Sequence, residues 1–141
     1  MNINPIACEP ALDLIPTPQG ELTLKVMADR FSVNSNGDVF GGWVALHMDQ
    51  AGELAARKTA GVSRVVAVSI GAMNFLRPVK TGDIVAFYSQ AMSVGSSSIT
   101  VDVEAWIETE SLMNKLTESS LVFVAIDSSG RAKTVNNTLK Y

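Results

Sequence analysis

Alternation of hydrophobic and polar residues dominates the second half of this chain. It is clearest over residues 97–107, where Ile99, Val101 and Val103 face one way and Thr100 and Asp102 face the other. This period of two is typical of an antiparallel strand with one dry face. Similar β-branched or aromatic runs predict strands over residues 21–27, 64–76, 83–94 and 120–127. A short hairpin turn over 94–97 and a longer connection over 77–83 separate the middle strands.

Residues 43–58 have the length and the alanine content of a helix, and Gly61 is expected to end it. Apolar side chains cover most of its circumference and leave Asp49, Gln50, Glu53 and Arg57 on one arc. A helix so widely apolar must be wrapped by other elements. The order strand, helix, four strands therefore predicts an α+β fold, in which a curved antiparallel β-sheet wraps around one long central helix.

The 141 residues, with a hydrophobic fraction of 47%, suit one globular domain, which we expect over residues 21–141. Four of the five prolines fall in the first eighteen residues, so residues 1–20 are predicted to form a flexible leader. Cys8 lies in this leader and is interpreted as incidental, because no neighbour in the sequence would lower its pKa.

Charge and composition exclude several classes of function. The net charge of −3 comes without a run of Lys or Arg, so a nucleic-acid footprint is not expected. One Cys and one His argue against a disulfide and against a thiolate or multi-histidine metal site, so neither metal nor cofactor is predicted. No apolar run approaches the length of a membrane span, and no basic residue precedes Lys25. These features favour a cytoplasmic protein without a membrane partner.

The segment 34–43 is the strongest candidate for chemistry, because its glycine-rich turn runs directly into the helix that carries Asp49. Amides at a helix N-terminus can hold a negative charge, and an acid two turns further along can act on a bound group. Another interpretation is a solvated stripe in which Asp49, Glu53 and Arg57, one turn apart, form an ion pair. If both acids are buried, their repulsion is expected to raise one pKa.

Several blocks in order make the chain resemble the hot-dog-fold acyl-CoA thioesterases, and within them the YciA-like branch. These blocks are residues 34–43 with Met48 and Asp49, then 64–66, 73–79, 82–85, 94–95 with 97–99, and 123–127 with 130–131. The resemblance covers nearly everything after the leader. It implies hydrolysis of acyl-CoA thioesters to a free acid and CoA. It also implies a homodimer with shared active sites, expected as a trimer of dimers, which is a hexamer.

The resemblance also implies roles for individual residues. Asp49 matches the catalytic acid, as general base or nucleophile, and Asn34 matches the loop asparagine that positions water or substrate from the opposite subunit. Gly41 and Gly42 match the glycine pair at the helix entrance, where an amide can stabilise an oxyanion. Ser97 lies in a matching block and is expected to bind substrate. The cations near turns, which are candidates for the CoA phosphates, are Arg64, Arg77, Lys80, Arg131 and Lys133.

Two alternatives of a different class stay open. A hot-dog hydratase or dehydratase would need His47, which on a helix projects about 200° away from Asp49, so that only a partner subunit could bring the two together. A non-catalytic acyl-CoA-binding module is the other alternative. A serine-hydrolase triad has little support, since no Gly-x-Ser-x-Gly elbow occurs.

Overall fold

Five strands and one helix form the regular structure of residues 16–135, the part of the chain that the computed structural model describes. In chain order they are β1 (Glu21–Met27), α2 (Gly41–Ala60), β2 (Val65–Ile70), β3 (Ile84–Val94), β4 (Ser98–Glu108) and β5 (Met113–Ala125). The first strand is as predicted, and the helix is two residues longer at each end than the sequence pattern indicated.

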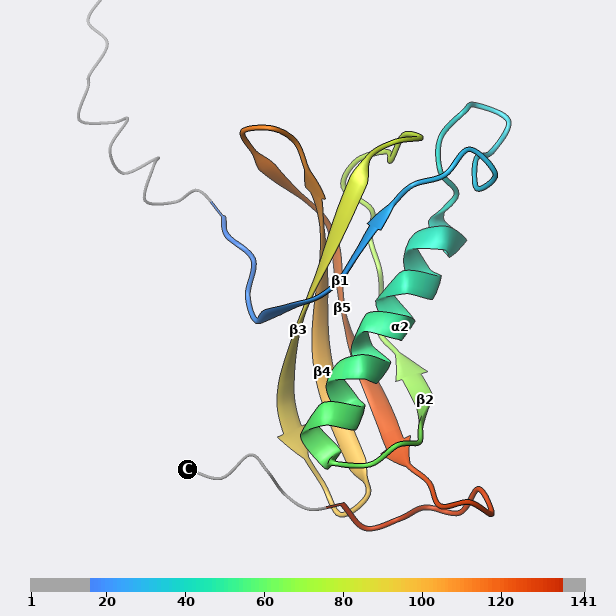
Figure 1. Cartoon of the computed structure of the whole chain (residues 1–141), viewed down its shortest axis with the longest axis vertical. Helices are drawn as coiled ribbons and strands as arrows, with labels where there is room; N and C mark the ends of the chain where they lie inside the picture. The colour runs from blue at the N-terminus through green and yellow to red at the C-terminus, as the bar shows by residue number, and fades with distance from the viewer. Residues whose placement is uncertain (1–15, 136–141) are drawn as a thin grey trace, which may run out of the picture.

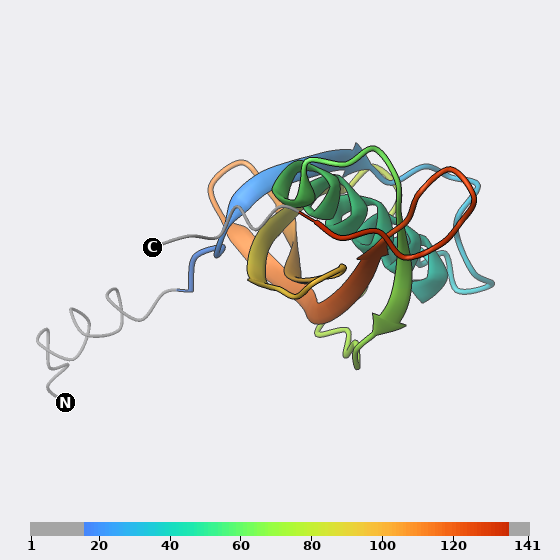
Figure 2. The same ribbon diagram turned by 90° about the horizontal axis from the view of Figure 1, so that it is seen from below.

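The strands form one antiparallel sheet in the order β1-β3-β4-β5-β2, so that β1 and β2 are its two edges. Each of the four ladders has one register shift, and such bulges increase the local twist of a sheet. The sheet curls around α2, which Figure 1 shows along its length and Figure 2 shows nearly end-on. The predicted α+β hot-dog architecture is confirmed.

Small residues let α2 lie close to the floor of the sheet. A Cβ added at Gly52 would come within 2.9 Å of the Phe123 ring, and Phe123 itself is fully buried. Ala51 and Ala56 are also completely buried against the sheet. The helix ends as predicted at Gly61, whose φ of 67° is left-handed and whose N–H donates to the Arg57 carbonyl.

Two of the predicted strand boundaries were wrong. The strand expected over residues 64–76 stops at Ile70, although the chain still runs beside β5. There the Ser119 and Thr117 hydroxyls donate to the carbonyls of Gly71 and Asn74, at 3.0 and 2.8 Å. These side-chain bonds add to two backbone bonds, from Gly71 N–H to Ser120 and from Leu76 N–H to Leu116, which are too widely spaced to form a regular ladder. The last strand, expected over 120–127, begins at Met113 instead, because its first half is too polar to show a dry face.

The outer face of the sheet is partly covered. Trp106 points to that face as the alternation predicted, yet only 1% of it is exposed, and its indole N–H donates to Glu104. The backbone N–H of Gln19 donates to the same carboxylate at 3.2 Å, so the end of the predicted leader lies beside this tryptophan. The rest of that leader, including Cys8, lies outside the described residues. No helix within residues 16–135 combines the length and apolarity that a membrane crossing needs.

Candidate active site

Asp49 lies on the flank of α2 that is turned toward the edge strand β2. The Ala51 carbonyl accepts a hydrogen bond from Ser89 of β3, and Gly52 faces Phe123 of β5. At 100° per residue, Asp49 lies beyond Gly52 on the side away from Ala51. Since β2 is the strand next to β5, Asp49 points toward that edge of the sheet.

The Asp49 carboxyl group has an oxygen that is enclosed without a partner. Oδ1 is buried and receives no hydrogen bond from any residue that the structure describes. Burial raises the pKa of Asp49 above its usual value, and the nearby Glu53 carboxylate raises this pKa further. A buried polar atom without a partner costs free energy. Its presence here is typical of a group kept for chemistry rather than for stability.

The arc of α2 beyond Asp49 carries an ion pair, as one interpretation of the sequence expected. Arg57 Nη2 bonds Glu53 Oε2 one turn further along the helix. Asp49 takes no part in this pair. Glu53 and Arg57 are therefore paired, whereas Asp49 is not. The condition that both acids are buried is not met, because Glu53 is partly exposed, and burial of Asp49 itself is the larger cause of its raised pKa.

The first turn of α2 is an open helix N-terminus. Phe40 occupies the N-cap position and makes no side-chain capping bond, so the amides of Gly41 and Gly42 are not capped by a side chain. An added Cβ at Gly41 would lie 3.1 Å from the Phe75 ring, whereas at Gly42 the closest ring atom would be 3.4 Å away. The glycine pair therefore keeps the approach to these amides clear.

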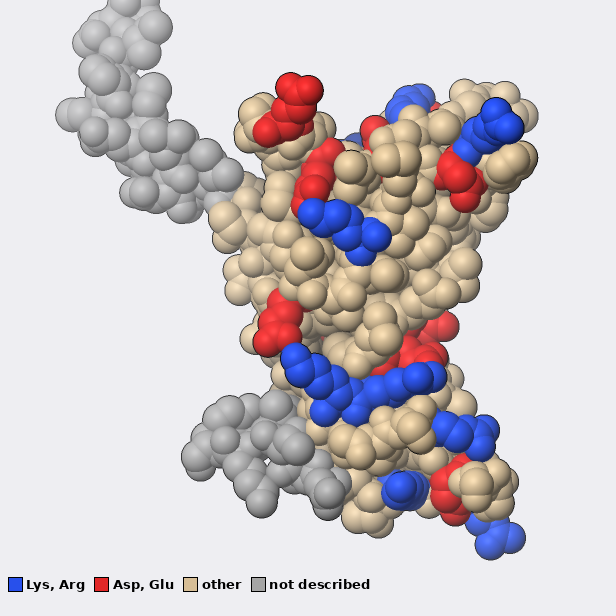
Figure 3. Space-filling view, in the orientation of Figure 1, with Lys and Arg blue, Asp and Glu red and all other residues tan. Residues whose placement is uncertain are grey.

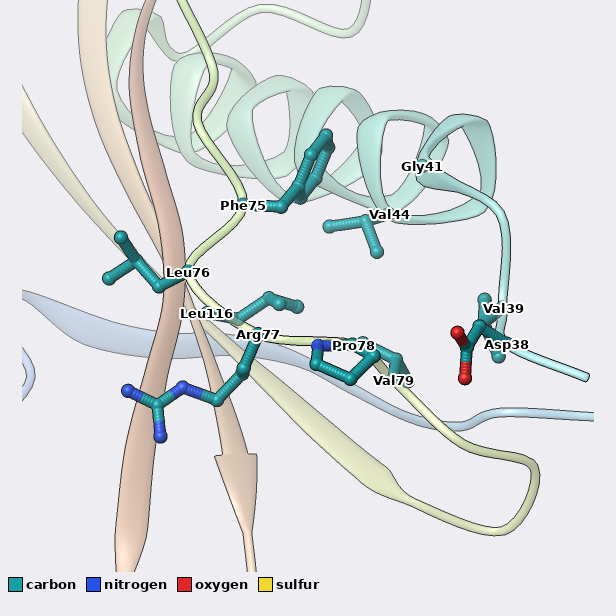
Figure 4. Close-up of a pocket in the computed structure, with 10 residues that line it drawn as sticks. All are labelled: Asp38, Val39, Gly41, Val44, Phe75, Leu76, Arg77, Pro78, Val79 and Leu116. Carbon is teal, nitrogen blue, oxygen red and sulfur yellow. The ribbon is translucent and has the colours of Figure 1, made fainter. Parts of the chain in front are cut away.

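A pocket of about 360 Å³ lies between this first turn and the segment that follows β2. Gly41 and Val44 line it from the helix, Phe75 and Arg77 line it from the opposite segment, and Asp38 lies at its rim (Figure 4). Figure 4 also shows that the Arg77 guanidinium projects away from Gly41. Of the predicted site residues, Gly41 and Arg77 thus share one pocket.

The loop before the helix is held by Asn34. Its Oδ1 accepts the backbone N–H of Asn36 at 2.9 Å and of Asp38 at 3.1 Å, which leaves the amide NH₂ as the group that could meet a ligand. Asp38 in turn forms an ion pair with Lys80. Lys80 therefore has a partner within its own chain, and its positive charge is partly neutralised.

Arg64 and Ser97 lie at the other end of α2 from Gly41 and Lys80. Arg64 donates to the carbonyls of Asp127 and Ser128, both at 3.4 Å, and the Ser97 carbonyl accepts from Ala125. Figure 1 places these turns beside the end of the helix, and Figure 3 shows Lys and Arg side chains gathered at that end. A single chain therefore places Gly41 and Lys80 at one end of the 20-residue helix and Arg64 and Ser97 at the other, with Asp49 between the two ends.

His47 lies on the opposite flank from Asp49. Its ring lies 4.4 Å from that of Trp43 and 5.9 Å from that of Phe87, and Nδ1 is 2.7 Å from the Trp43 carbonyl. This geometry is that of a packed, hydrogen-bonded side chain. Within residues 16–135, no three His, Cys, Asp or Glu side chains gather in a way that could hold a metal ion.

Comparison with known proteins agrees with the hot-dog fold and with the resemblance to acyl-CoA thioesterases. The model of the thioesterase superfamily matches residues 36–114. The acyl-CoA thioester hydrolase YciA of Salmonella typhimurium is 39% identical over 122 residues, which are 83% of this chain and 91% of the relative. An uncharacterized acyl-CoA thioester hydrolase of Haemophilus influenzae is 38% identical, over 83% of this chain and 79% of its own.

Solved structures agree. The hexameric thioesterase of Yersinia pestis has a TM-score of 0.80 at 38% identity and covers 86% of this chain and 99% of its own. An acyl-CoA hydrolase of Staphylococcus aureus, solved with butyryl coenzyme A and coenzyme A, has a TM-score of 0.74 at 30% identity, over 81% and 70% of the two chains. This chain therefore belongs to the thioesterase superfamily, among the hot-dog-fold acyl-CoA thioester hydrolases.

Sequence reasoning missed two features of the site. Phe75 closes one side of the pocket at Gly41, but the strand predicted over 64–76 gave no reason to place it against the helix. The Asp38–Lys80 pair joins two loops 42 residues apart, and only an ordinary surface charge could be expected from either residue alone. Both contacts join segments far apart in the chain, so a short window of sequence carries no signal for either.

Proposed function

We propose that this protein hydrolyses acyl-CoA thioesters to a free acid and CoA, with Asp49 as general base or nucleophile. The observation that carries the proposal is the enclosed, unpartnered Asp49 oxygen, on the helix whose open N-terminus lies two turns away, in a member of this family. A base works best when its pKa approaches the working pH, and burial raises the pKa of Asp49 in that direction.

In the general-base form of the reaction, Asp49 accepts a proton from water as the water oxygen adds to the thioester carbonyl carbon. The negative charge that develops on the carbonyl oxygen is stabilised by the Gly42 amide at the start of α2. The C–S bond then breaks, and the CoA sulfur leaves as a thiolate that takes up a proton. In the nucleophilic form, the Asp49 carboxylate attacks the carbonyl carbon, the C–S bond breaks, and the CoA thiolate leaves and takes up a proton. Water then cleaves the resulting anhydride to the free acid and the Asp49 carboxylate.

A second copy of the chain is needed to complete this site. The edge strand β2 exposes Val66, Val68 and Ile70 and has no neighbour on its outer side. Pairing of two such edges about a twofold axis would bury the exposed apolar side chains and give the unpaired backbone groups of β2 a partner. The solved Yersinia pestis relative is hexameric, which supports an assembly of three such dimers.

The twofold axis also reunites the divided residues. Two antiparallel β2 strands bring two antiparallel helices together, so the first turn of one α2 faces the end of the other. Arg64 and Ser97 of one copy would then approach Gly41, Arg77 and Lys80 of its partner. Asn34 would act across the same interface. CoA carries phosphates, and these cations are the groups that could meet them.

Release of free thiol from a panel of acyl-CoA esters tests the proposal directly. We expect catalytic release with at least one ester and a Michaelis constant that rises with ionic strength, because the phosphate contacts are electrostatic. Binding of acyl-CoA without release would instead favour the acyl-CoA-binding module. Hydration or dehydration of an acyl-CoA without thiol release would favour the hydratase. The expectation of a cytoplasmic enzyme stays a prediction.

A further inference from the structure

Glu53 and Arg57 continue the helix stripe on which Asp49 lies. The three residues are four positions apart, so each lies about one turn from the next, with Cβ atoms of neighbours roughly 5–6 Å apart. Arg57 bonds Glu53 and so restricts where the Glu53 carboxylate can lie. That carboxylate is half-buried, with 35% of its side chain exposed. Solvent therefore screens its charge only in part.

Within residues 16–135, no other ionisable group faces Asp49 from the strands that pack against α2. Strand β2 carries none, and residues of β4 such as Asp102 alternate with buried Val101 and Val103, so they point to the outer face. The remaining strand charges are paired with one another or with the opposite flank, as Lys25–Glu108, Lys115–Glu104, Lys115–Glu118 and Lys58–Glu21. Tyr88 of β3 donates to Met113 on the outer face.

We propose that Glu53 is a positioning residue for the reaction: held by Arg57, its carboxylate controls the ionisation of Asp49 one helical turn away. This inference rests on the proposed function, since it takes Asp49 as the group that must be charged to act. A negative neighbour makes Asp49 a stronger base, and Arg57 limits this effect by neutralising part of the Glu53 charge. The electrostatic influence of Glu53 on the pKa of Asp49 has the same sign.

The two members of the pair should therefore act in opposite directions. Glu53→Gln removes the negative charge, keeps the side chain's size and leaves Arg57 positive, so Asp49 should ionise at lower pH. Arg57→Gln leaves Glu53 unneutralised, so Asp49 should ionise at higher pH. Lys58→Gln is the matched control, because Lys58 is the next residue in the same last turn but pairs with Glu21 on the opposite flank.

The measurement is thioester hydrolysis as a function of pH, with each variant of the full-length protein normalised to its own plateau. On the acid side, we expect Glu53→Gln to keep roughly twofold more of its plateau activity than the parent, the effect of one like-charge pair at this spacing. Arg57→Gln should keep less than the parent, and Lys58→Gln should match it. Unchanged profiles for both Glu53→Gln and Arg57→Gln, or shifts in the same direction, would overturn the inference.

A second readout does not depend on catalysis. The Asp49 carboxyl carbon can be followed by NMR in protein labelled with ¹³C at aspartate, and Asp49→Asn identifies its resonance by loss. We expect its titration midpoint to fall in Glu53→Gln and to rise in Arg57→Gln. A midpoint that ignores both variants refutes the role of Glu53. A midpoint that moves while the activity profile stays fixed refutes Asp49 as the titrating base instead.

Discussion

The two flanks of α2 carry the sole histidine of the chain and an acid only two residues away, yet they differ in every physical respect. His47 contacts two aromatic rings, tilted against Trp43 and stacked on Phe87, and its Nδ1 is hydrogen-bonded to a backbone carbonyl. Asp49 has an enclosed oxygen without a partner, beside an edge strand that is itself unpaired. Satisfied polar groups hold a fold together, and an unsatisfied one at an open edge identifies the place where something else must bind.

Cavity volume favours the other flank of α2, the one that carries His47. A hollow of about 690 Å³ lies on the His47 flank between α2, β1 and β3, nearly twice the volume of the pocket at Gly41. None of the residues predicted from the sequence to take part in chemistry lines it. The unpartnered acid and the uncapped helix N-terminus, and not the larger volume, therefore distinguish the Asp49 flank.

Substitution of Asp49 and of His47, each by an amide residue, should give the largest difference in the rate of thioester hydrolysis. Asp49→Asn is expected to reduce thioester hydrolysis by about a hundredfold or more while the protein stays folded, the range typical of a lost general base. His47→Gln should change it by much less, because His47 is engaged in packing. Steady-state rates and circular dichroism on both variants check this. Parent-like turnover in Asp49→Asn would return Asp49 to the role of a surface charge.

The role of the edge strand β2 in assembly can be tested by comparison with the other edge strand, β1. Val68→Lys places a charge on exposed β2, where the twofold axis would bring two copies of it together at a cost of several kcal/mol, so association should weaken by about a hundredfold. Activity should fall with it. Leu22→Lys makes the same change on the exposed edge strand β1. Light scattering that shows equal loss of assembly in both variants would contradict pairing through β2.

The close packing of α2 on the sheet fixes the positions of both helix flanks. Substitution of Gly52 tests how much this packing contributes to stability. Gly52→Ala would place a methyl group 2.9 Å from the buried Phe123 ring, so we expect a loss of roughly 1–3 kcal/mol in the free energy of unfolding. Gln50→Ala, on the exposed side of the same helix, should stay within about 0.5 kcal/mol of the parent. Urea denaturation of both variants measures the difference. Equal stability would mean that the helix can shift away from the sheet.

The smallest expected effect is on stability as a function of pH. The folded-state pKa of Asp49 is raised, so between its unfolded and folded values the folded protein holds more protons, and parent stability falls as pH rises through that window. Asp49→Asn lacks this group. The variant should therefore be more stable than the parent near neutral pH, and the two should converge at acid pH. Thermal unfolding at pH 3 and pH 7 gives the comparison, and a constant difference would contradict the raised pKa.

Local patterns determined most of the fold. The alternation in β4, the alanine-rich helix and its glycine stop depend on neighbours along the chain, and each is found where the sequence placed it. The predicted boundary was wrong where a polar stretch pairs with β4 alone, as in the first half of β5. The boundary after Ile70 was wrong as well, because there hydroxyl groups of β5 bond the neighbouring segment and no regular backbone ladder continues. Neither kind of contact leaves a trace within a short window of sequence.

The same division holds for the site. The sequence by itself singled out Asp49 and the glycine pair, from the glycine-rich turn that runs into one helix and from the resemblance to the family, and their roles stay predictions. Only the tertiary structure decided that Asp49 is enclosed without a partner while His47 is satisfied, since burial depends on which strand lies under each flank. It also decided that Arg64 and Ser97 lie far from Gly41 within one chain. A long helix inside a curved sheet holds these residues at opposite ends of one chain, and the dimer that we propose would bring them together.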